Sequence, residues 1–375
     1  MREENMFLKN LRGLFLMFPV MKTYVFILLS VYPIVGFSQV ISEISASYEK
    51  SSGYIDKVDT IISVKLNVNS EYEQFEVHGS NFYYDIRPNI SLSTKISFSY
   101  RFISVGIGFK PRFIPGNNDN DMQGKTSTLS FGLNILTSHW MQALQFGYVN
   151  GFYLHNTADY PPTPDWTKGE DPYIQFPDLK VAVLRGSTGY KLNKNFSLKS
   201  ISSKTEIQLK SCGSLIPYLV YEYFEMDNKS SDPKQNSSQR TNNFDALASL
   251  GYFYTFVIKS KYYASLGVVP GFGFQHTNLL TRYPDENVTT LYTNPLFRLQ
   301  ENAGIGYNSR KFYSGAELSL AQSSHSQGNT SVQEKATRTF FQVFVGYRFS
   351  APKFLKHETD VVKNLAPAPV QKILE

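Results

Sequence analysis

The sequence predicts an all-β fold, a single antiparallel transmembrane β-barrel of about 12 strands, with short turns at one end and long loops at the other. Three observations predict this class. Aromatic residues make up 15% of the 375 residues and charged residues 18%, against about 25% charged residues in ordinary globular chains. Amphipathic segments recur in pairs joined by tight turns. A secretory signal precedes them, and no later stretch is apolar enough for a helical span.

The hairpin at 96–109 shows the alternation most clearly. When this segment is extended and folded at its centre, Phe98 lies opposite Val105 on an apolar face, and Ser97 lies opposite Gly106 on a polar face. Successive strand side chains point to opposite sides, so the two faces follow once the chain is extended. An apolar outside and a polar inside are what a closed sheet needs to sit in a membrane.

The same pattern continues to residue 349. Further amphipathic strands are predicted at 61–69, 125–136, 246–258, 296–307 and 339–349. Two polar residues, Gln142 and Glu301, fall on faces that are otherwise apolar. The alternation therefore covers most of the chain behind the signal.

Turn-forming residues divide the connections into two kinds. Short turns are predicted at 101–102, 136–139, 193–194, 259–261 and 308–311, and long polar loops at 111–124, 154–178, 226–242, 276–291 and 323–337. In outer-membrane barrels the short turns are periplasmic and the long loops extracellular. This alternation is kept only if 195–225 is one interrupted strand. The stretch 203–213 would then be irregular, either bending into the lumen or forming a bulge.

The amino-terminal residues indicate export. Met21-Lys22 precedes a mostly apolar segment, and Ser38-Gln39 follows it, as in a secretory signal cleaved near Ser38. The apolar segment is shorter than the roughly 20 residues of a membrane anchor. The protein is therefore predicted to reach the bacterial outer membrane through a cleaved signal peptide. The expected parts are a signal with an upstream extension at 1–38, an N-terminal periplasmic segment at 39–59, an outer-membrane β-barrel at 60–349 and a C-terminal periplasmic tail at 350–375.

Charge and cysteine content exclude several kinds of partner. The formal net charge of +6 is dispersed along the chain, so no nucleic acid is expected as a partner. Cys212 is the single cysteine, which excludes an intrachain disulfide and a thiolate metal cluster. The 6 histidines show no metal-ligand spacing, and the sequence contains no phosphate loop. No metal and no cofactor are expected.

Several short motifs resemble those of one family. They are Arg87-Pro88-Asn89, Gly124-Lys125-Thr126, Gly151-Phe152-Tyr153-Leu154, Phe176-Pro177-Asp178-Leu179, the stretch from Glu206 to Ser214, and the closing Val345-Gly346-Tyr347-Arg348-Phe349. In their order and spacing they resemble an uncharacterised family of Gram-negative outer-membrane proteins, known only as a domain of unknown function. The resemblance would cover about 55–349. It implies a barrel and supplies no activity, cofactor or catalytic residue.

A polar stretch supplies candidate lumen residues. Glu206, Gln208 and Lys210 share one face if 205–210 is extended, and Ser211 follows them. Two interpretations stay open. Either these residues form a cluster in the lumen that gates the barrel or binds a solute, or they are a charge pair filling an interior that must be polar in any case.

The closing strand and the outer wall supply further candidates. Gly346, Tyr347 and Phe349 resemble the last-strand signal that barrel-assembly machinery recognises, although the final strand of a soluble sandwich would show the same alternation. Outward-facing aromatic residues are expected to gather toward the membrane interfaces. The candidates for this membrane-facing set are Phe98, Tyr100, Phe131, Trp140, Phe146, Tyr254, Phe256 and Tyr262.

No catalytic residue is assigned. Ser324-His325-Ser326 lies in a predicted loop, and no strand-borne histidine supplies the base that a nucleophile requires. The sequence predicts a non-enzymatic barrel, either a small-solute pore or binding barrel, or an envelope scaffold. Two alternatives stay open: an outer-membrane enzyme acting on lipid or polysaccharide, and a soluble exported barrel that binds an apolar ligand. The expected partners are outer-membrane lipid, the barrel-assembly machinery during biogenesis, and a small solute.

Overall fold

The computed structural model describes residues 53–58, 61–78, 83–90, 92–111, 113–114, 117, 119–229, 238–326 and 333–352. All of them belong to one compact unit, Ser52–Glu375. The predicted signal, most of the predicted N-terminal segment and most of the predicted C-terminal tail therefore lie outside the described residues.

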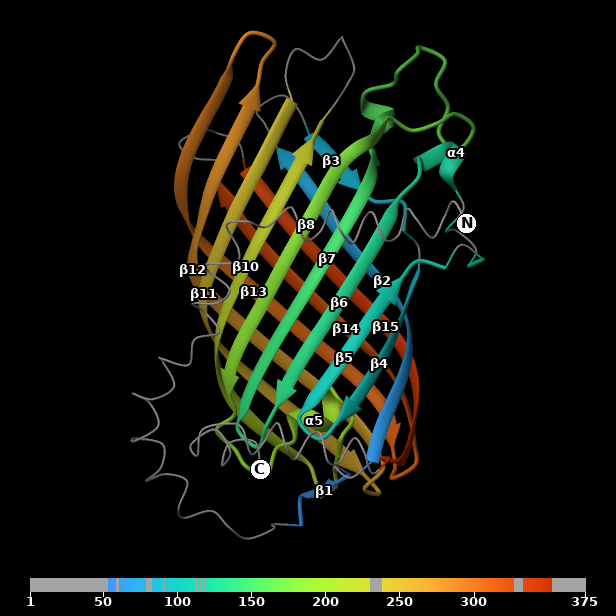
Figure 1. The fold of residues 1–375 in the computed structure, drawn as a ribbon, viewed down its shortest axis with the longest axis vertical. Helices are drawn as coiled ribbons and strands as arrows, with labels where there is room; N and C mark the ends of the chain where they lie inside the picture. The colour runs from blue at the N-terminus through green and yellow to red at the C-terminus, as the bar shows by residue number, and fades with distance from the viewer. Residues whose placement is uncertain are drawn as a thin grey trace. The chain divides into compact units, whose positions relative to one another are not determined.

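Twelve antiparallel strands form a closed β-barrel (Figure 1). In chain order they are β2 (Ile61–His78), β4 (Ser93–Tyr100), β5 (Ile103–Phe109), β6 (Ser127–Leu136), β7 (Trp140–Leu154), β8 (Gln175–Tyr190), β10 (Cys212–Asn228), β11 (Ser238–Ile258), β12 (Tyr262–Arg282), β13 (Asn287–Asn308), β14 (Phe312–Ser326) and β15 (Gln333–Ser350). Each strand pairs with the next in this series, and β15 pairs with β2 along its whole length, which closes the barrel. The predicted fold class and strand number are confirmed.

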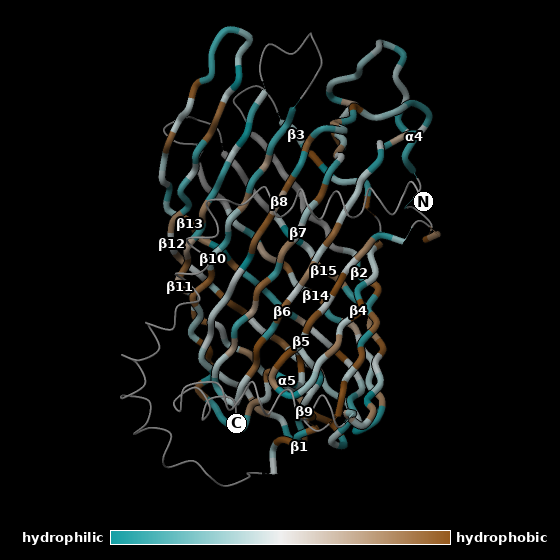
Figure 2. The backbone as a smooth tube through the Cα atoms, in the orientation of Figure 1, coloured by the Kyte–Doolittle hydropathy of each residue, from teal (hydrophilic) through white to brown (hydrophobic). Residues whose placement is uncertain are grey.

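The strands separate polar from apolar side chains as the hairpin at 96–109 predicts. Phe98 pairs with Val105, and Ser97 pairs with Gly106. Phe98 is 56% exposed on the outer face, whereas Ser97 is 6% exposed on the inner face. Hydrophobic and hydrophilic segments alternate along the strands of Figure 2 for this reason. Because closure leaves no free strand edge, the wall pairs its backbone amides within the barrel.

Gln142 and Glu301 lie on the outer face, as the sequence indicates. Gln142 of β7 donates from Nε2 to Tyr221 OH of β10 over 2.7 Å and accepts at Oε1 from Thr188 Oγ1 of β8 over 2.6 Å. The polar atoms of Gln142 are therefore satisfied within the wall. Glu301 of β13 lies opposite Val268 of β12, and nothing in the described structure explains a carboxylate there.

The two ends of the barrel differ. At the end that we call the turn end, tight turns join β4 to β5, β6 to β7, β11 to β12 and β13 to β14. At the opposite end, the loop end, β3 (Tyr83–Arg87) bridges β2 and β7. The connections there also contain α4 (Asn120–Gln123) and η1 (Thr157–Asp159). The helices of the described residues are single turns, none of which could span a membrane.

Three of the predicted loops are shorter than expected. β12 runs to Arg282 and β13 starts at Asn287, so most of the predicted loop at 276–291 is a hairpin. Strands shorten the predicted loops at 226–242 and 323–337 in the same way. These segments are rich in polar residues, but an antiparallel ladder continues as long as its two strands stay in register.

The predicted interrupted strand at 195–225 is wrong over its first part. After β8 the chain forms α5 (Leu198–Ile201) and β9 (Glu206–Gln208), and only β10 crosses the wall. β9 pairs with β1 (Ile55–Lys57) in a separate two-stranded sheet. Lys204 has a φ of 59°, which interrupts any extended run. The chain therefore bends into the lumen before β10 and does not form a bulge in the wall.

Toward the loop end the two faces of β8 and β10 exchange character. Lys180 is exposed and Glu225 lies on the same outer face, while the neighbouring inner side chains are apolar. A buried apolar cluster forms inside the barrel from Phe152, Leu179, Val181 and Val183, with Ile86, Val149, Phe176, Phe224 and Met226 packed against it. Apolar side chains avoid water. Their inward orientation here, with charged side chains outside, indicates that water surrounds this part of the wall.

Candidate functional site

A segment between β8 and β10 occupies the turn end of the lumen, and we call residues 191–211 the plug. Figure 1 shows its helix α5 within the ring of strands. Ser197 caps this helix, accepting at Oγ a hydrogen bond from the Ser200 amide over 3.0 Å. A serine at this position satisfies a free amide of the first turn, which explains why a short helix begins here.

Glu206 and Gln208 hold the plug together. Ser197 Oγ donates to Glu206 Oε2 over 2.6 Å, and the Ser197 amide donates to Gln208 Oε1 over 2.7 Å. Lys199 Nζ also lies 3.6 Å from Glu206 Oε1. The two side chains share one face, as an extended 206–208 requires. Gln208 Nε2 also donates to the Asn195 carbonyl oxygen within the plug over 2.8 Å and to the Tyr54 carbonyl oxygen before β1 over 3.3 Å.

The side chains of Lys210 and Ser211 make other contacts, although the Lys210 carbonyl oxygen accepts from Gln208 Nε2 over 3.1 Å. Lys210 Nζ is 5.2 Å from the ring centre of Tyr54. Ser211 Oγ accepts a hydrogen bond from the Val257 amide over 2.9 Å, at the turn end of β11, where β10 no longer pairs with it. The structure therefore does not bring the four predicted lumen residues into one cluster.

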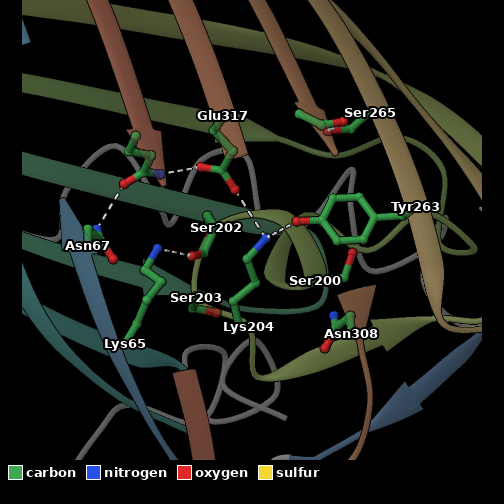
Figure 3. Close-up of polar contacts among 12 residues, drawn as sticks. Lys65, Asn67, Ser200, Ser202, Ser203, Lys204, Tyr263, Ser265, Asn308 and Glu317 are labelled. Atoms are coloured by element: carbon green, nitrogen blue, oxygen red, sulfur yellow. Dashed lines mark hydrogen bonds and ion pairs between the residues drawn. The ribbon is translucent and has the colours of Figure 1, made fainter. Parts of the chain in front are cut away.

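Lys204 connects the plug to the wall. Its side chain is fully buried, and its Nζ donates to Tyr263 OH of β12 over 2.8 Å and to Glu317 Oε1 of β14 over 3.1 Å (Figure 3). Its carbonyl oxygen accepts from Arg348 Nε of β15 over 2.8 Å. Three wall strands therefore bind one plug residue.

Hydrogen bonds continue from Glu317 along the wall. Gln342 of β15 donates from Nε2 to Glu317 Oε2 and accepts at Oε1 from Asn67 Nδ2 of β2 over 2.8 Å. Both carboxylate oxygens of Glu317 are thus occupied, one by Lys204 and one by Gln342. Beside this chain, Lys65 Nζ of β2 donates to the carbonyl oxygen of Ser202 in the plug over 3.3 Å (Figure 3).

Lys191 anchors the base of the plug. Its Nζ donates to the Phe196 carbonyl oxygen, and its amide donates to the His139 carbonyl oxygen over 2.8 Å. Burial lowers the pKa of the Lys191 ammonium to about 8, and the nearby carboxylate of Glu206 opposes this shift. The base of the plug therefore contains a cation that is lost in mildly alkaline solution.

A polar cavity of about 190 Å³ lies between the plug and the inner faces of β2, β4, β5, β6, β14 and β15. Its lining includes Lys65, Asn67, Lys95, Asn134, Ser202 and Glu317. A Cβ on Gly106 of β5 would lie 2.5 Å from Lys95 Cε, so this glycine lets the lysine stem lie flat across the wall. Asn67 Oδ1 is buried and has no hydrogen-bond partner among the described residues.

A second polar layer crosses the lumen farther from the turn end. Arg298 of β13 donates to Glu222 Oε2 of β10 over 3.2 Å and to Asp245 Oδ2 of β11 over 2.7 Å. Arg338 of β15 donates to Gln145 Oε1 of β7 over 3.3 Å. Strands β15 and β7 are far apart around the barrel in both directions, so this contact spans the lumen.

The segment before β2 holds the plug at the turn end. β1 pairs with β9, and the Leu209 amide donates to the Tyr54 carbonyl oxygen over 2.7 Å. Asp56 of β1 accepts two hydrogen bonds from Arg310, in the turn between β13 and β14, over 2.9 and 3.0 Å. The plug is therefore tied both to the barrel wall and to the residues that precede the barrel.

Motif segments that are far apart in the sequence meet at the loop end. The Asn89 amide donates to Thr126 Oγ1 over 2.8 Å, and Thr126 Oγ1 donates to the Gly151 carbonyl oxygen over 2.7 Å. Gly151 has a φ of 90°. A Cβ at this position would lie 2.0 Å from the Lys125 carbonyl oxygen, so only glycine fits there. Phe152 pairs with Phe176. Residues of the family motifs thus build a cap at the loop end and part of the plug at the turn end.

The predicted membrane-facing aromatics differ in exposure. Phe98, Phe131, Phe256 and Tyr262 are exposed, and Trp140, Phe146 and Tyr254 are half-buried. Tyr100 is only 7% exposed, and the guanidinium of Arg101, in the adjoining turn, is 5.4 Å from its ring centre. The outward position of Tyr100 that its register suggests is therefore covered.

The closing strand places its three predicted signal residues on both faces. A Cβ on Gly346 would lie 2.0 Å from Tyr313 Cζ, and Tyr313 is fully buried, with its OH 2.8 Å from Ser63 Oγ. Tyr347 and Phe349 are exposed on the outer face. Packing alone therefore accounts for Gly346, whereas nothing inside the barrel requires the two aromatic rings.

The described histidines lie in separate places. His276 Nδ1 is 2.8 Å from Thr293 Oγ1, and His139 Nδ1 is 3.3 Å from Ser138 Oγ. The backbone of His325 belongs to β14 and not to a loop as predicted. Among the residues that the structure describes, no three His, Cys, Asp or Glu side chains could together hold a metal ion.

The architecture defines the class of the molecule as a closed antiparallel β-barrel with an internal plug. The chain belongs to a family described as a domain of unknown function, DUF4421, whose model matches residues 50–349. The family resemblance that the sequence motifs indicate is confirmed. No curated protein matches the sequence significantly.

Several solved structures are similar in outline. The outer-membrane protease OmpT from Escherichia coli is 10% identical with a TM-score of 0.37, over 78% of this chain and 98% of that one. The translocator domain of the autotransporter NalP from Neisseria meningitidis is 9% identical with a TM-score of 0.34, over 84% and 96%. The toluene transporter TodX from Pseudomonas putida is 8% identical with a TM-score of 0.26, over 76% and 89%. Similarities this distant indicate no activity for this chain.

Sequence analysis missed the residues that join the plug to the wall. Lys65 lies on the polar face of the predicted strand at 61–69, and Glu317 lies on the polar face of the segment that follows the predicted turn at 308–311. A charge on an inner face was the available signal for both. Lys204 carried no such signal, because it lies in an irregular stretch. Its role depends on wall strands that follow it by 59 to 144 residues.

Proposed function

We propose that this protein is an outer-membrane barrel that holds a small solute in a lumen closed at its periplasmic end by the plug. It is neither an open diffusion pore nor an enzyme in this proposal. The observation that carries it is the buried Lys204, which three wall strands bind inside the lumen. A group that is buried and held in this way closes the passage, and the cavity beside it provides a place for a solute.

The outer surface supports insertion in a membrane. Large apolar side chains are exposed on the outer faces of the wall strands, for example Phe98, Leu266 and Val343. The charged outer side chains of β8 and β10 follow only toward the loop end, where apolar side chains turn inward. A polar lumen enclosed by an apolar band is the arrangement of barrels that cross the outer membrane.

Planar-bilayer conductance of the refolded protein tests the closed lumen. The wild-type protein is expected to show no steady conductance. A variant in which 195–210 is replaced by a short glycine-serine linker is expected to conduct. Equal steady conductance of both proteins would contradict the proposal, because the plug would then not close the passage.

Fractionation and gel mobility test the membrane placement independently. The protein is expected in the outer-membrane fraction, with an electrophoretic mobility that shifts on heating, as for a barrel that resists detergent until it is boiled. Recovery in the soluble periplasm would remove the membrane placement.

Hydrolysis of lipid or polysaccharide by the purified barrel, lost on substitution of His276 by alanine, would favour the alternative of an enzyme.

A further inference from the structure

We infer that the lumenal cavity binds a small organic anion, whose carboxylate or phosphate group is held by Lys65 and Lys95. This inference deepens the proposed function by naming the class of solute. The two lysines come from β2 and β4 and line the same cavity. Amide and hydroxyl side chains line the cavity beside the two lysines. These groups can form hydrogen bonds with a solute that also carries hydroxyl groups.

The first step of the argument is that the carboxylate of the cavity is already occupied. Glu317 accepts from Lys204 Nζ at one oxygen and from Gln342 Nε2 at the other. It is therefore held in place to bind the plug and does not serve as a free acceptor for a cationic solute. A cation entering the cavity would have to displace Lys204 or Gln342 from Glu317, which would leave a buried group without its partner.

The second step is that Lys65 and Asn67 have hydrogen-bonding atoms at the cavity that their contacts with the described residues do not fully use. An ammonium carries three donors, and Lys65 Nζ makes one long hydrogen bond, 3.3 Å to the Ser202 carbonyl oxygen. The Asn67 amide donates to Gln342 from Nδ2, while its Oδ1 is buried without a partner among the described residues. A solute with an anionic group next to a hydroxyl group would use both residues. Its carboxylate or phosphate would accept from Lys65 Nζ, and its hydroxyl would donate to Asn67 Oδ1.

The third step is the charge of the cavity lining. Among the described residues that line the cavity are two ammonium groups, those of Lys65 and Lys95, and one carboxylate, that of Glu317, which is paired with Lys204 of the plug. Cationic groups at a cavity wall attract solutes of the opposite sign.

Isothermal titration calorimetry on the protein refolded in an uncharged detergent tests the inference. D-Gluconate and D-glucose form a matched pair that differs in a carboxylate, and glucose 6-phosphate and inorganic phosphate separate a phosphorylated organic anion from the free ion. We expect at least one organic anion to bind, at least ten-fold tighter than glucose and than inorganic phosphate. The binding should weaken with added salt. Glucose binding as tightly as gluconate and glucose 6-phosphate would overturn the inference, and so would the absence of binding by every organic anion.

Variants locate the site. Lys65→Met and Lys95→Met are each expected to weaken anion binding at least ten-fold. Asn67→Asp, which keeps the side-chain volume but adds a negative charge, should do the same. Lys261→Met in the exposed turn between β11 and β12 is the matched control and should bind as the wild type does. Unchanged binding in folded Lys65→Met and Lys95→Met proteins, judged by the heat-shifted mobility, would overturn the assignment of the two lysines.

Conductance separates this inference from the proposed function. A closed wild-type barrel that binds none of the anions refutes the solute class and leaves the closed lumen standing. A barrel that conducts steadily refutes the closed lumen, whether or not it binds anions.

Discussion

At Lys204 the backbone, the carbonyl oxygen and the ammonium are each held by a different contact. Its φ of 59° places a non-glycine residue in the left-handed region, which costs of order 1 kcal/mol or more. Such a conformation persists only where the surroundings over-determine it. Three hydrogen bonds hold Lys204 in this conformation. Its carbonyl oxygen accepts from Arg348, and its Nζ donates to Tyr263 and Glu317.

The pairing of Lys204 with Glu317 predicts a strong coupling between them. Lys204→Met and Glu317→Gln should each destabilise the docked plug by about 3 kcal/mol, because removing one partner of a buried pair leaves the other without compensation. The double variant should lose much less than the sum. Hydrogen exchange of the plug amides, with urea unfolding as a second readout, measures the cycle. Additive losses would show that the two groups do not depend on each other.

Lys191 predicts a pH dependence of stability. Burial lowers the pKa of its ammonium to about 8 in the folded protein, while the unfolded value is about 10.4. Between these values the unfolded chain binds more protons, so the free energy of unfolding should rise with pH, by at most about 3 kcal/mol. Below pH 8 this contribution is absent. Urea unfolding of the wild type and of Lys191→Met from pH 7 to 11 should show a steeper rise in the wild type than in the variant.

At the scale of single elements, the short strand β1 does more than precede the barrel. It supplies the strand partner of β9 and, through Asp56, an ion pair to the turn between β13 and β14. Two-stranded sheets are marginal by themselves, so β9 depends on both β1 and the wall to keep its position. Whatever moves β1 therefore acts on the plug.

Removal of β1 is expected to loosen the plug without opening the wall. A protein that starts at residue 59 behind its signal should keep the heat-shifted mobility of a folded barrel, because no wall strand is lost. Its plug amides should exchange faster, and brief conductance events should appear in planar bilayers. The milder Asp56→Asn variant is the control and should lie between the two. Unchanged exchange in the truncated protein would show that the wall alone holds the plug.

The closing strand predicts two separable defects. Gly346→Ala should lower the stability of the barrel by a few kcal/mol, because the new methyl group collides with the buried Tyr313. Phe349→Ala should leave stability nearly unchanged and reduce the amount of folded protein in the outer membrane, since its exposed ring packs against nothing in the lumen. Urea unfolding and quantitative membrane fractionation distinguish the two. Equal membrane yields for Phe349→Ala and the wild type would remove the assembly role.

At the scale of the whole barrel, the apolar band predicts a depth dependence for outward charges. Leu266→Arg lies in the middle of β12, on the outer face, and should destabilise the barrel in lipid by about 2–4 kcal/mol. Thr289→Arg lies near the loop-end tip of β13 and should cost about 0–1 kcal/mol. Unfolding from bilayers measures both. Similar costs at the two positions would show that no lipid band surrounds the wall.

The alternation of side chains made the barrel predictable. In the hairpin at 96–109 each apolar residue faces the same side, and the predicted pairs Phe98–Val105 and Ser97–Gly106 are the pairs that form. The candidate site was far less predictable. Glu206 and Gln208 share a face as expected, but that face binds Ser197 and not the cavity. Lys210 and Ser211 lie elsewhere, and the cavity gathers Lys65, Lys95 and Glu317 from strands that lie far apart in the sequence.

The wall could be derived from the chain alone because a strand's period of two is local: each residue's face follows from its neighbour's. The even number of strands followed in turn from the requirement that short and long connections alternate. The plug, the cavity and the loop-end cap could not be derived in this way. Their contacts join Lys204 to residues as far as position 348 and Asn89 to Thr126 and Gly151. Only the closed sheet brings these residues together, since closure places strands from the two ends of the chain around one lumen.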